Sequence, residues 1–238
     1  MTDLIILAAA LLPAVVLWLY ILRKDPQPEP KSWLMKAVAY GVAISVPVVP
    51  VEMIVSNMLF GVDGQPGTIL GATFDAFFVA ALPEECFKLL ALWLILRKNP
   101  YFDEHFDGIV YAACVGLGFA AIENVGYLFT YSDEWASVAI SRAFLAVPGH
   151  YAFAVLMGYY YSVHHFVDRS PRAAAAVLLF PVMAHGIYDT LAMSIDVHPY
   201  LGGLCSFALI YFCVKMQRFA RTKVTALIEQ DKREQYFG

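Results

Sequence analysis

The chain has 238 residues, of which 60% are hydrophobic, and its mean hydropathy is +0.63. Soluble domains contain about 45–50% apolar residues, so this composition argues against a soluble globular protein. The formal net charge is −4, and no basic stripe with interleaved aromatic residues occurs, so no nucleic-acid partner is expected.

The apolar residues fall in blocks long enough to cross the roughly 30 Å hydrocarbon core as helices. The first block, Leu4 to Leu22, is not preceded by the basic residues of a signal peptide; Arg23 and Lys24 follow it instead. This charge order predicts a retained first span with its N-terminus outside. In chain order we expect about seven spans, at roughly residues 4–22, 34–59, 69–96, 107–131, 139–163, 173–195 and 199–220. The predicted fold class is an all-α, polytopic transmembrane helix bundle.

Lys and Arg residues gather after the first, third, fifth and seventh predicted spans. The intervening connections, near Asp63, Asp133-Glu134 and Asp196, are nearly free of them. By the positive-inside rule, this alternation predicts that the N-terminus is out and the C-terminus is in. We expect residues 1–22 to form a first transmembrane anchor, 23–33 a cytoplasmic linker, 34–222 the membrane core and 223–238 a cytoplasmic tail.

Ionisable side chains interrupt four of the predicted spans. They are Glu84, Glu85 and Lys88 in the third span, Glu123 in the fourth, His150 in the fifth, and His185 and Asp189 in the sixth. One ionised side chain facing lipid at a helix centre costs about 2.5–3.5 kcal/mol, so the four carboxylates and the lysine together would cost about 12–17 kcal/mol. These groups must therefore face one another or a water-filled cavity.

Spacing and depth favour a single cluster. Both glutamates of the third span can meet Lys88, at i,i+4 and i,i+3, and His185 shares a helix face with Asp189. At 1.5 Å per residue, the polar groups of all four spans lie about 20–24 Å from the cytoplasmic ends of their helices. Prolines and glycines near them loosen the helices, so we expect a hydrated pocket that opens outward.

The order of these motifs resembles the PrsW family, a branch of the superfamily that includes the CAAX prenyl proteases. The matching residues are EExxK (Glu84, Glu85, Lys88), FxxxE (Phe119, Glu123), ENxxY (Glu123, Asn124, Tyr127), PGH (Pro148, Gly149, His150) and HxxxD (His185, Asp189). The resemblance covers roughly residues 34–195. Relatives that process prenylated proteins have histidine in place of Glu123 and asparagine in place of Asp189, which argues against a prenyl substrate.

The resemblance implies a multi-pass intramembrane endopeptidase of a bacterial inner (cytoplasmic) membrane. Its partners would be the lipid bilayer and a membrane-spanning protein substrate, such as an anti-sigma factor that receives its first cut toward the extracytoplasmic side.

Hydrolysis of a peptide bond requires an activated water and a donor for the oxyanion, and a buried carboxylate suits the role of base. We assign Glu84 or Glu85 as that base, with Lys88 holding the second carboxylate ionised. His185 would orient the water or stabilise the oxyanion, with Asp189 fixing its tautomer. Glu123 and His150 would complete the water site.

Three alternatives stand beside this hypothesis. A zinc site is one, because two histidines and a carboxylate form a known catalytic ligand set. No HExxH motif occurs, so we favour a metal-free glutamate mechanism and assign no cofactor.

A proton-coupled transporter is the second alternative, because buried Glu, His and Asp chains also serve as proton relays. No inverted repeat supports it. A non-catalytic scaffold is the third, and it would leave the cost of the buried charges unexplained.

Two further polar residues lie in the predicted spans without a catalytic assignment. Arg142 is interpreted as an interfacial anchor rather than a substrate clamp, and Glu52 as a solvated residue at the mouth of the pocket.

Overall fold

The computed structural model describes residues 2–61, 67–197 and 200–237. This part of the chain is helical and contains no strand, which confirms the predicted all-α class. The helices are α1 (Thr2–Leu22), α2 (Lys31–Phe60), α3 (Ile69–Phe74), η1 (Asp75–Ala81), α4 (Leu82–Leu96), α5 (His105–Thr130), α6 (Trp135–Ser141), η2 (Arg142–Ala146), α7 (Val147–Ser162), η3 (Val163–Val167), α8 (Pro171–Val197) and α9 (Gly202–Phe237).

Five helical segments are long and apolar enough to cross a membrane, which indicates a multi-pass membrane protein. They are α1, α2, α5, α8 and the continuous run Trp135–Val167. The third predicted span is also one unbroken run, from α3 through η1 to α4, and the seventh corresponds to the first half of α9. Neither is among the five, so their crossing of the membrane stays a prediction, as does the orientation of the termini. Asp63, used in that orientation, lies outside the described residues.

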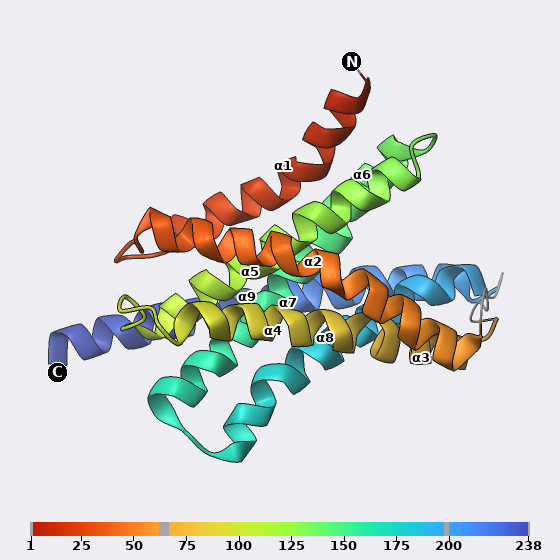
Figure 1. Cartoon of the computed structure of the whole chain (residues 1–238). Coiled ribbons are helices and arrows are strands. Elements are labelled where there is room, and N and C mark those ends of the chain that lie inside the picture. Colours follow the sequence, from red (N-terminus) through yellow and green to blue (C-terminus); the bar gives the residue numbers. More distant parts are fainter. Residues whose placement is uncertain (1, 62–66, 198–199, 238) are drawn as a thin grey trace.

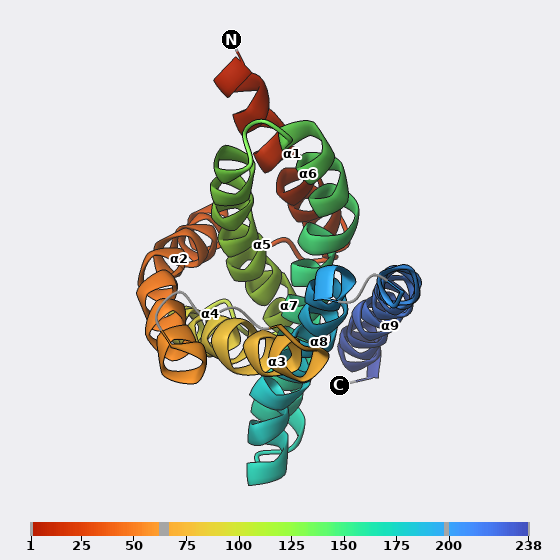
Figure 2. The ribbon, with the colours of Figure 1, turned by 90° about the vertical axis from the view of Figure 1, so that its right-hand side faces the viewer.

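Helix α5 lies at the centre of the bundle, with α1, α2 and α7 packed around it (Figures 1 and 2). Small residues allow the backbones to approach closely. A Cβ added to Gly118 would lie 2.5 Å from the carbonyl oxygen of Val38 on α2. A Cβ added to Gly158 on α7 would lie 2.3 Å from the carbonyl oxygen of Gly108. Gly118 therefore lets α5 approach α2, and Gly108 with Gly158 brings together α5 and α7, the helices that carry Glu123 and His150.

Two π-helical turns precede the two proline motifs. In η1 and η2 the ladder widens to i→i−5, so that the amide of Leu82 bonds the carbonyl of Phe77 and the amide of Val147 bonds that of Arg142. Pro83 and Pro148 follow directly, and neither has an amide hydrogen to extend the normal ladder. π-bulges of this kind are frequent at functional sites. Here the two turns directly precede the helices that carry the glutamate pair and His150.

Helix α9 runs along the outside of the bundle (Figure 2). The Gln217 amide donates to the carbonyl of Pro148 at 2.6 Å. Further along, the Asp231 carboxylate accepts the backbone amides of His105 and Phe106, both at 2.9 Å, and so caps the start of α5. As far as Phe237, the residues of the predicted tail are thus a continuation of α9.

The connection between α1 and α2 contains a buried acid. Glu29 is 8% exposed and accepts a hydrogen bond from the hydroxyl of Tyr111 on α5. Burial raises the pKa of Glu29 to about 7, and the nearby carboxylates of Asp25 and Asp103 act in the same direction. The folded protein therefore favours the neutral acid, and the stability that Glu29 contributes is lost as pH rises through about 7.

We expect the melting temperature of the purified protein to fall as pH rises from about 4.5, the ordinary pKa of a glutamate, to about 7, and Glu29→Gln to flatten this fall because the amide stays neutral. Thermal unfolding in detergent at a series of pH values measures it. Glu229→Gln, an exposed position on α9, is the matched control and should titrate like the wild type. An unchanged pH profile in Glu29→Gln would contradict the assignment.

Candidate active site

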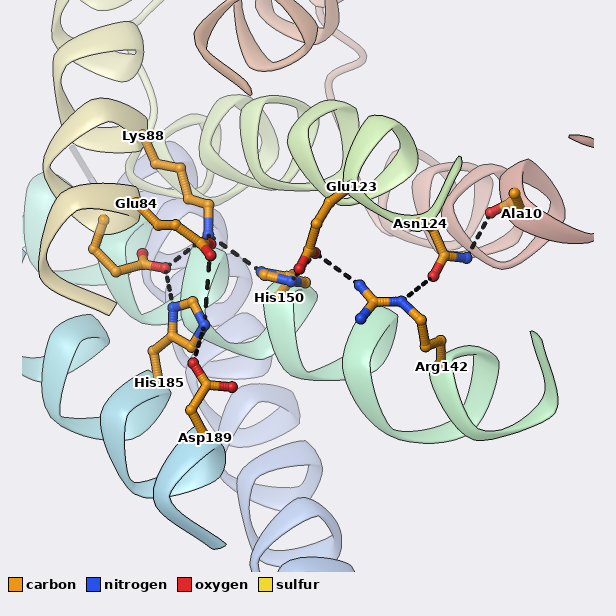
Figure 3. Close-up of polar contacts among 10 residues, drawn as sticks. Ala10, Glu84, Lys88, Glu123, Asn124, Arg142, His150, His185 and Asp189 are labelled. Atoms are coloured by element: carbon orange, nitrogen blue, oxygen red, sulfur yellow. Dashed lines mark hydrogen bonds and ion pairs between the residues drawn. The ribbon is translucent and has the colours of Figure 1, made fainter. Parts of the chain in front are cut away.

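The Lys88 ammonium lies at the centre of the buried polar cluster (Figure 3). Its Nζ is 2.9 Å from Glu84 Oε2 and 2.8 Å from Glu85 Oε1. These are the i,i+4 and i,i+3 contacts that the spacing predicts, and both lie on α4. The same Nζ is 3.2 Å from Nδ1 of His150 on α7. One lysine therefore joins the two carboxylates of α4 to the histidine of another helix.

His185 on α8 lies between two carboxylates. Its Nδ1 is 2.9 Å from Glu85 Oε1, and its Nε2 is 3.1 Å from Asp189 Oδ2, one helical turn further along. Glu84 Oε2 is 4.0 Å from the same Nε2. A doubly protonated imidazolium would donate to both close carboxylates. Asp189 therefore faces a ring whose other nitrogen is already engaged by Glu85.

On the other side of Lys88, His150 leads to Glu123 on α5. The Nε2 of His150 is 2.7 Å from Glu123 Oε2. An ammonium can only donate, so Nδ1 of His150 must accept from Lys88 and Nε2 must carry the proton that Glu123 accepts. The hydrogen-bond network thus selects one tautomer of His150.

The cluster is enclosed within the bundle. Glu85 is 0% exposed, and Glu84, Lys88, His150 and His185 are all buried. The Phe119 ring lies 4.3 Å below the ammonium, which accounts for the aromatic residue one turn before Glu123. Little solvent is present to screen these charges, so each group depends on its neighbours for stabilisation.

All seven residues singled out from the sequence lie in this one network. Glu84, Glu85 and Lys88 come from α4, Glu123 from α5, His150 from α7, and His185 and Asp189 from α8. Whether they act catalytically stays a prediction.

Three polar residues near the cluster were not assigned to it from the sequence. Glu52 is half-buried and interacts electrostatically with Glu84 and Glu123, and Asp75 of η1 does so with Asp189. Arg142 forms an ion pair with Glu123 at 2.8 Å. The cost of a charge within an apolar span is the signal that would have found all three.

The cluster has the donors of a metal site. Glu84, Glu85, His150 and His185 each offer one ligand atom, and these atoms lie within 4.8 Å of one another. Two imidazoles with carboxylates are the donor types of catalytic zinc. Oε2 of Glu85 is buried and, among the described residues, has no hydrogen-bond partner. The residues fit a divalent metal in kind, although the Lys88 ammonium already balances their charge.

Comparisons with known proteins agree on one family. A model described as PrsW family intramembrane metalloprotease matches residues 29–216. The Protease PrsW of Geobacillus kaustophilus is 32% identical over 91% of this chain and 92% of its own. The proteins of the same name from Clostridioides difficile and Bacillus subtilis are 35% and 31% identical, each over 80% of this chain, and these matches cover 79% and 84% of those proteins. No solved structure matches the chain.

Proposed function

Because the chain belongs to the PrsW family of intramembrane proteases, we propose that it hydrolyses a peptide bond of a membrane-spanning protein at the cluster around Lys88. The observation that carries the proposal is the convergence of Glu84, Glu85, His150 and His185 from three helices on one buried point. These are the side chains that hydrolysis requires for proton transfer and for charge stabilisation.

Glu84 is the better candidate for the general base. Its side chain keeps 7% exposure, whereas that of Glu85 has none, so Glu84 is the more accessible to water. Glu85 is held by two partners on one oxygen, Lys88 and His185. We assign Glu85 to anchoring those two groups and Glu84 to taking the proton from the attacking water. On cleavage, that proton passes to the leaving amine.

Positive charge beside the scissile carbonyl would stabilise the oxyanion as it develops. Lys88 and His185 are the nearest donors to Glu84, and they are already fixed by Glu85 and Asp189 before substrate arrives. Preorganised groups of this kind need no rearrangement at the moment of reaction. Glu123 and His150 complete the site by holding the opposite side of the ammonium.

The family description implies a metal, and Glu84, Glu85, His150 and His185 are the residues that would hold it. A catalytic zinc ion, when bound, acts as a Lewis acid and lowers the pKa of a bound water. In the metal-free mechanism that we favour, Glu84 accepts the proton of the attacking water and Glu85 keeps Lys88 and His185 in place.

The metal question has a direct test. The glutamate mechanism predicts that protein purified without added metal contains less than stoichiometric zinc and keeps its activity after prolonged dialysis against a chelator. Elemental analysis and a cleavage assay on the same sample measure both. The Glu84→Gln/His185→Ala variant controls for zinc bound elsewhere. Loss of cleavage on chelation with recovery on adding zinc would reverse the preference.

We place the protein in a bacterial inner membrane, with a membrane-spanning substrate such as an anti-sigma factor cut first toward the extracytoplasmic side. The polar layer supports this side, because it lies about 20–24 Å from the predicted cytoplasmic helix ends.

Co-expression with a panel of single-span reporter proteins tests the function. We expect a cleaved fragment with the wild type and none with Glu84→Ala, Glu85→Ala or His185→Ala. If all three variants cleave like the wild type, the proposal is wrong. Proton-driven flux in vesicles without any cleavage would favour a transporter instead.

A further inference from the structure

A second network continues from the candidate active site through Arg142, at the first position of η2. Arg142 Nη2 is 2.8 Å from Glu123 Oε2, the same oxygen that faces His150 Nε2 at 2.7 Å. Arg142 Nε donates to Asn124 Oδ1 at 2.5 Å. In the described part of the chain, Arg142 reaches the cluster only through Glu123 and His150.

The network ends on α1. The Asn124 amide donates to the carbonyl of Ala10 at 2.8 Å, and Asn124 is fully buried. Helix α1 precedes residues 29–216, which the family model matches. Figure 3 shows these contacts in sequence, from His150 through Glu123, Arg142 and Asn124 to Ala10. Three different helical segments therefore hold the guanidinium and the carboxylate in one place.

Arginine has the shape that this position requires. Its planar guanidinium presents several N–H donors in a fixed fork, and here one side faces Glu123 while Nε faces Asn124. The guanidinium carbon Cζ lies 3.9 Å from the ring centroid of Tyr127, one turn after Glu123 on α5. The Arg142 side chain is only 12% exposed. An interfacial anchor would reach toward headgroups, whereas this side chain is held from three directions inside the bundle.

The position of Glu123 determines how His150 faces Lys88. When Nε2 donates to Glu123, Nδ1 presents its lone pair to the Lys88 ammonium, 3.2 Å away. A Glu123 carboxylate free to rotate would release the ring, and Lys88 would lose the third of its polar partners. The effect on chemistry would be indirect, because Arg142 touches neither Glu84 nor His185 among the described contacts.

We propose that Arg142 is a positioning residue: tied to α1 through Asn124, it fixes the Glu123 carboxylate, which in turn fixes the orientation and tautomer of His150. The inference rests on the proposed function for its effect on cleavage, but its effect on the His150 ring is independent of that function.

Full-length protein in proteoliposomes, with a fluorogenic reporter carrying one transmembrane helix, provides the kinetic test. We expect Arg142→Gln to lower kcat by roughly 10- to 100-fold with KM little changed, because a misplaced catalytic group costs rate rather than binding. Arg142→Lys should recover part of the loss, since it keeps the charge but not the fork. In a Glu123→Gln background, Arg142→Gln should add no further loss, because the two act through one contact. Arg172→Gln, exposed at the start of α8, is the matched control.

The second measurement, of the His150 ring, does not depend on catalytic activity. In protein with ¹⁵N-labelled histidine, the His150 ring nitrogens should give the signals of a single Nε2–H tautomer in the wild type and averaged signals in Arg142→Gln, at one fixed pH. His150→Gln assigns the resonances.

Three results would overturn the proposal: kinetics of Arg142→Gln that match those of Arg172→Gln, a loss that adds fully to that of Glu123→Gln, or a loss confined to KM, which would make Arg142 a substrate clamp. If the wild type and His185→Ala cleave the reporter equally, the proposed function has failed instead. In that case the His150 signals alone decide whether Arg142 positions the ring.

Discussion

Replacing Glu84 with glutamine is expected to lower kcat by about 100- to 10,000-fold, the range associated with loss of a general base. The amide keeps the volume of the side chain but cannot take a proton from water. Glu84 contributes one of the two carboxylate contacts to Lys88, and the Glu85 contact at 2.8 Å remains in the variant. The melting temperature should therefore stay close to that of the wild type, although kcat falls strongly.

Glu85→Gln provides the comparison that separates the two glutamates. Glu85 Oε1 is shared by Lys88 and His185, so the variant should lose thermal stability as well as activity. Glu134→Gln, exposed before α6, controls for the general effect of removing an acid and should behave like the wild type. Initial rates and thermal unfolding on the same preparations measure both quantities. If the Glu84→Gln protein is active while the Glu85→Gln protein is stable but inactive, then Glu85 is the general base and Glu84 is not.

The sequence predicts the cluster well because ionisable side chains inside a bilayer must face one another or a water-filled cavity. Glu84, Glu85 and Lys88 were expected to meet because of their spacing on one helix, and His185 with Asp189 for the same reason. Contacts between residues on different helices, such as His150 with Lys88, were expected because these residues lie at similar distances from the cytoplasmic ends of their spans. Depth is readable from the sequence because the rise of a helix is constant.

The sequence does not predict which residue faces which across helices. Arg142 lies only eight positions before His150, yet its partner is Glu123 on α5, and it is the first residue of the π-helical turn η2. A hydropathy pattern assumes a regular helix and does not reveal such a turn. Glu52 and Asp75 were left out of the cluster because their approach depends on how α2 and η1 pack.

The length of α9 was also not predictable from hydropathy. Apolar residues become less frequent after Ala220, yet the helix continues to Phe237. Val224 and Leu227 in this part of the helix are buried in the core. The Asp231 carboxylate then accepts amides at the start of α5, a contact between residues more than a hundred positions apart. Such contacts come from tertiary packing, which a local pattern does not encode.

Lys88→Met is expected to have the second large effect, and on stability as well as rate. Methionine fills a similar volume but leaves Glu84, Glu85 and His150 without their shared donor. Removing one partner of a buried ion pair costs about 3–5 kcal/mol, because the remaining charge is left uncompensated. A protein of ordinary stability would melt many degrees lower or fail to accumulate in the membrane.

The triple variant Lys88→Met, Glu84→Gln, Glu85→Gln separates charge from chemistry. Neutralising the whole set removes the uncompensated charges, so much of the lost stability should return, while cleavage should stay absent. Thermal unfolding of both variants and the wild type, each with and without added zinc, measures this. If the four donors also suit a metal, zinc should raise the melting temperature of Lys88→Met more than that of the wild type or the triple variant, because it takes over the charge that the ammonium supplied. A Lys88→Met protein as stable as the wild type without any metal would show that the ammonium does not hold this cluster together.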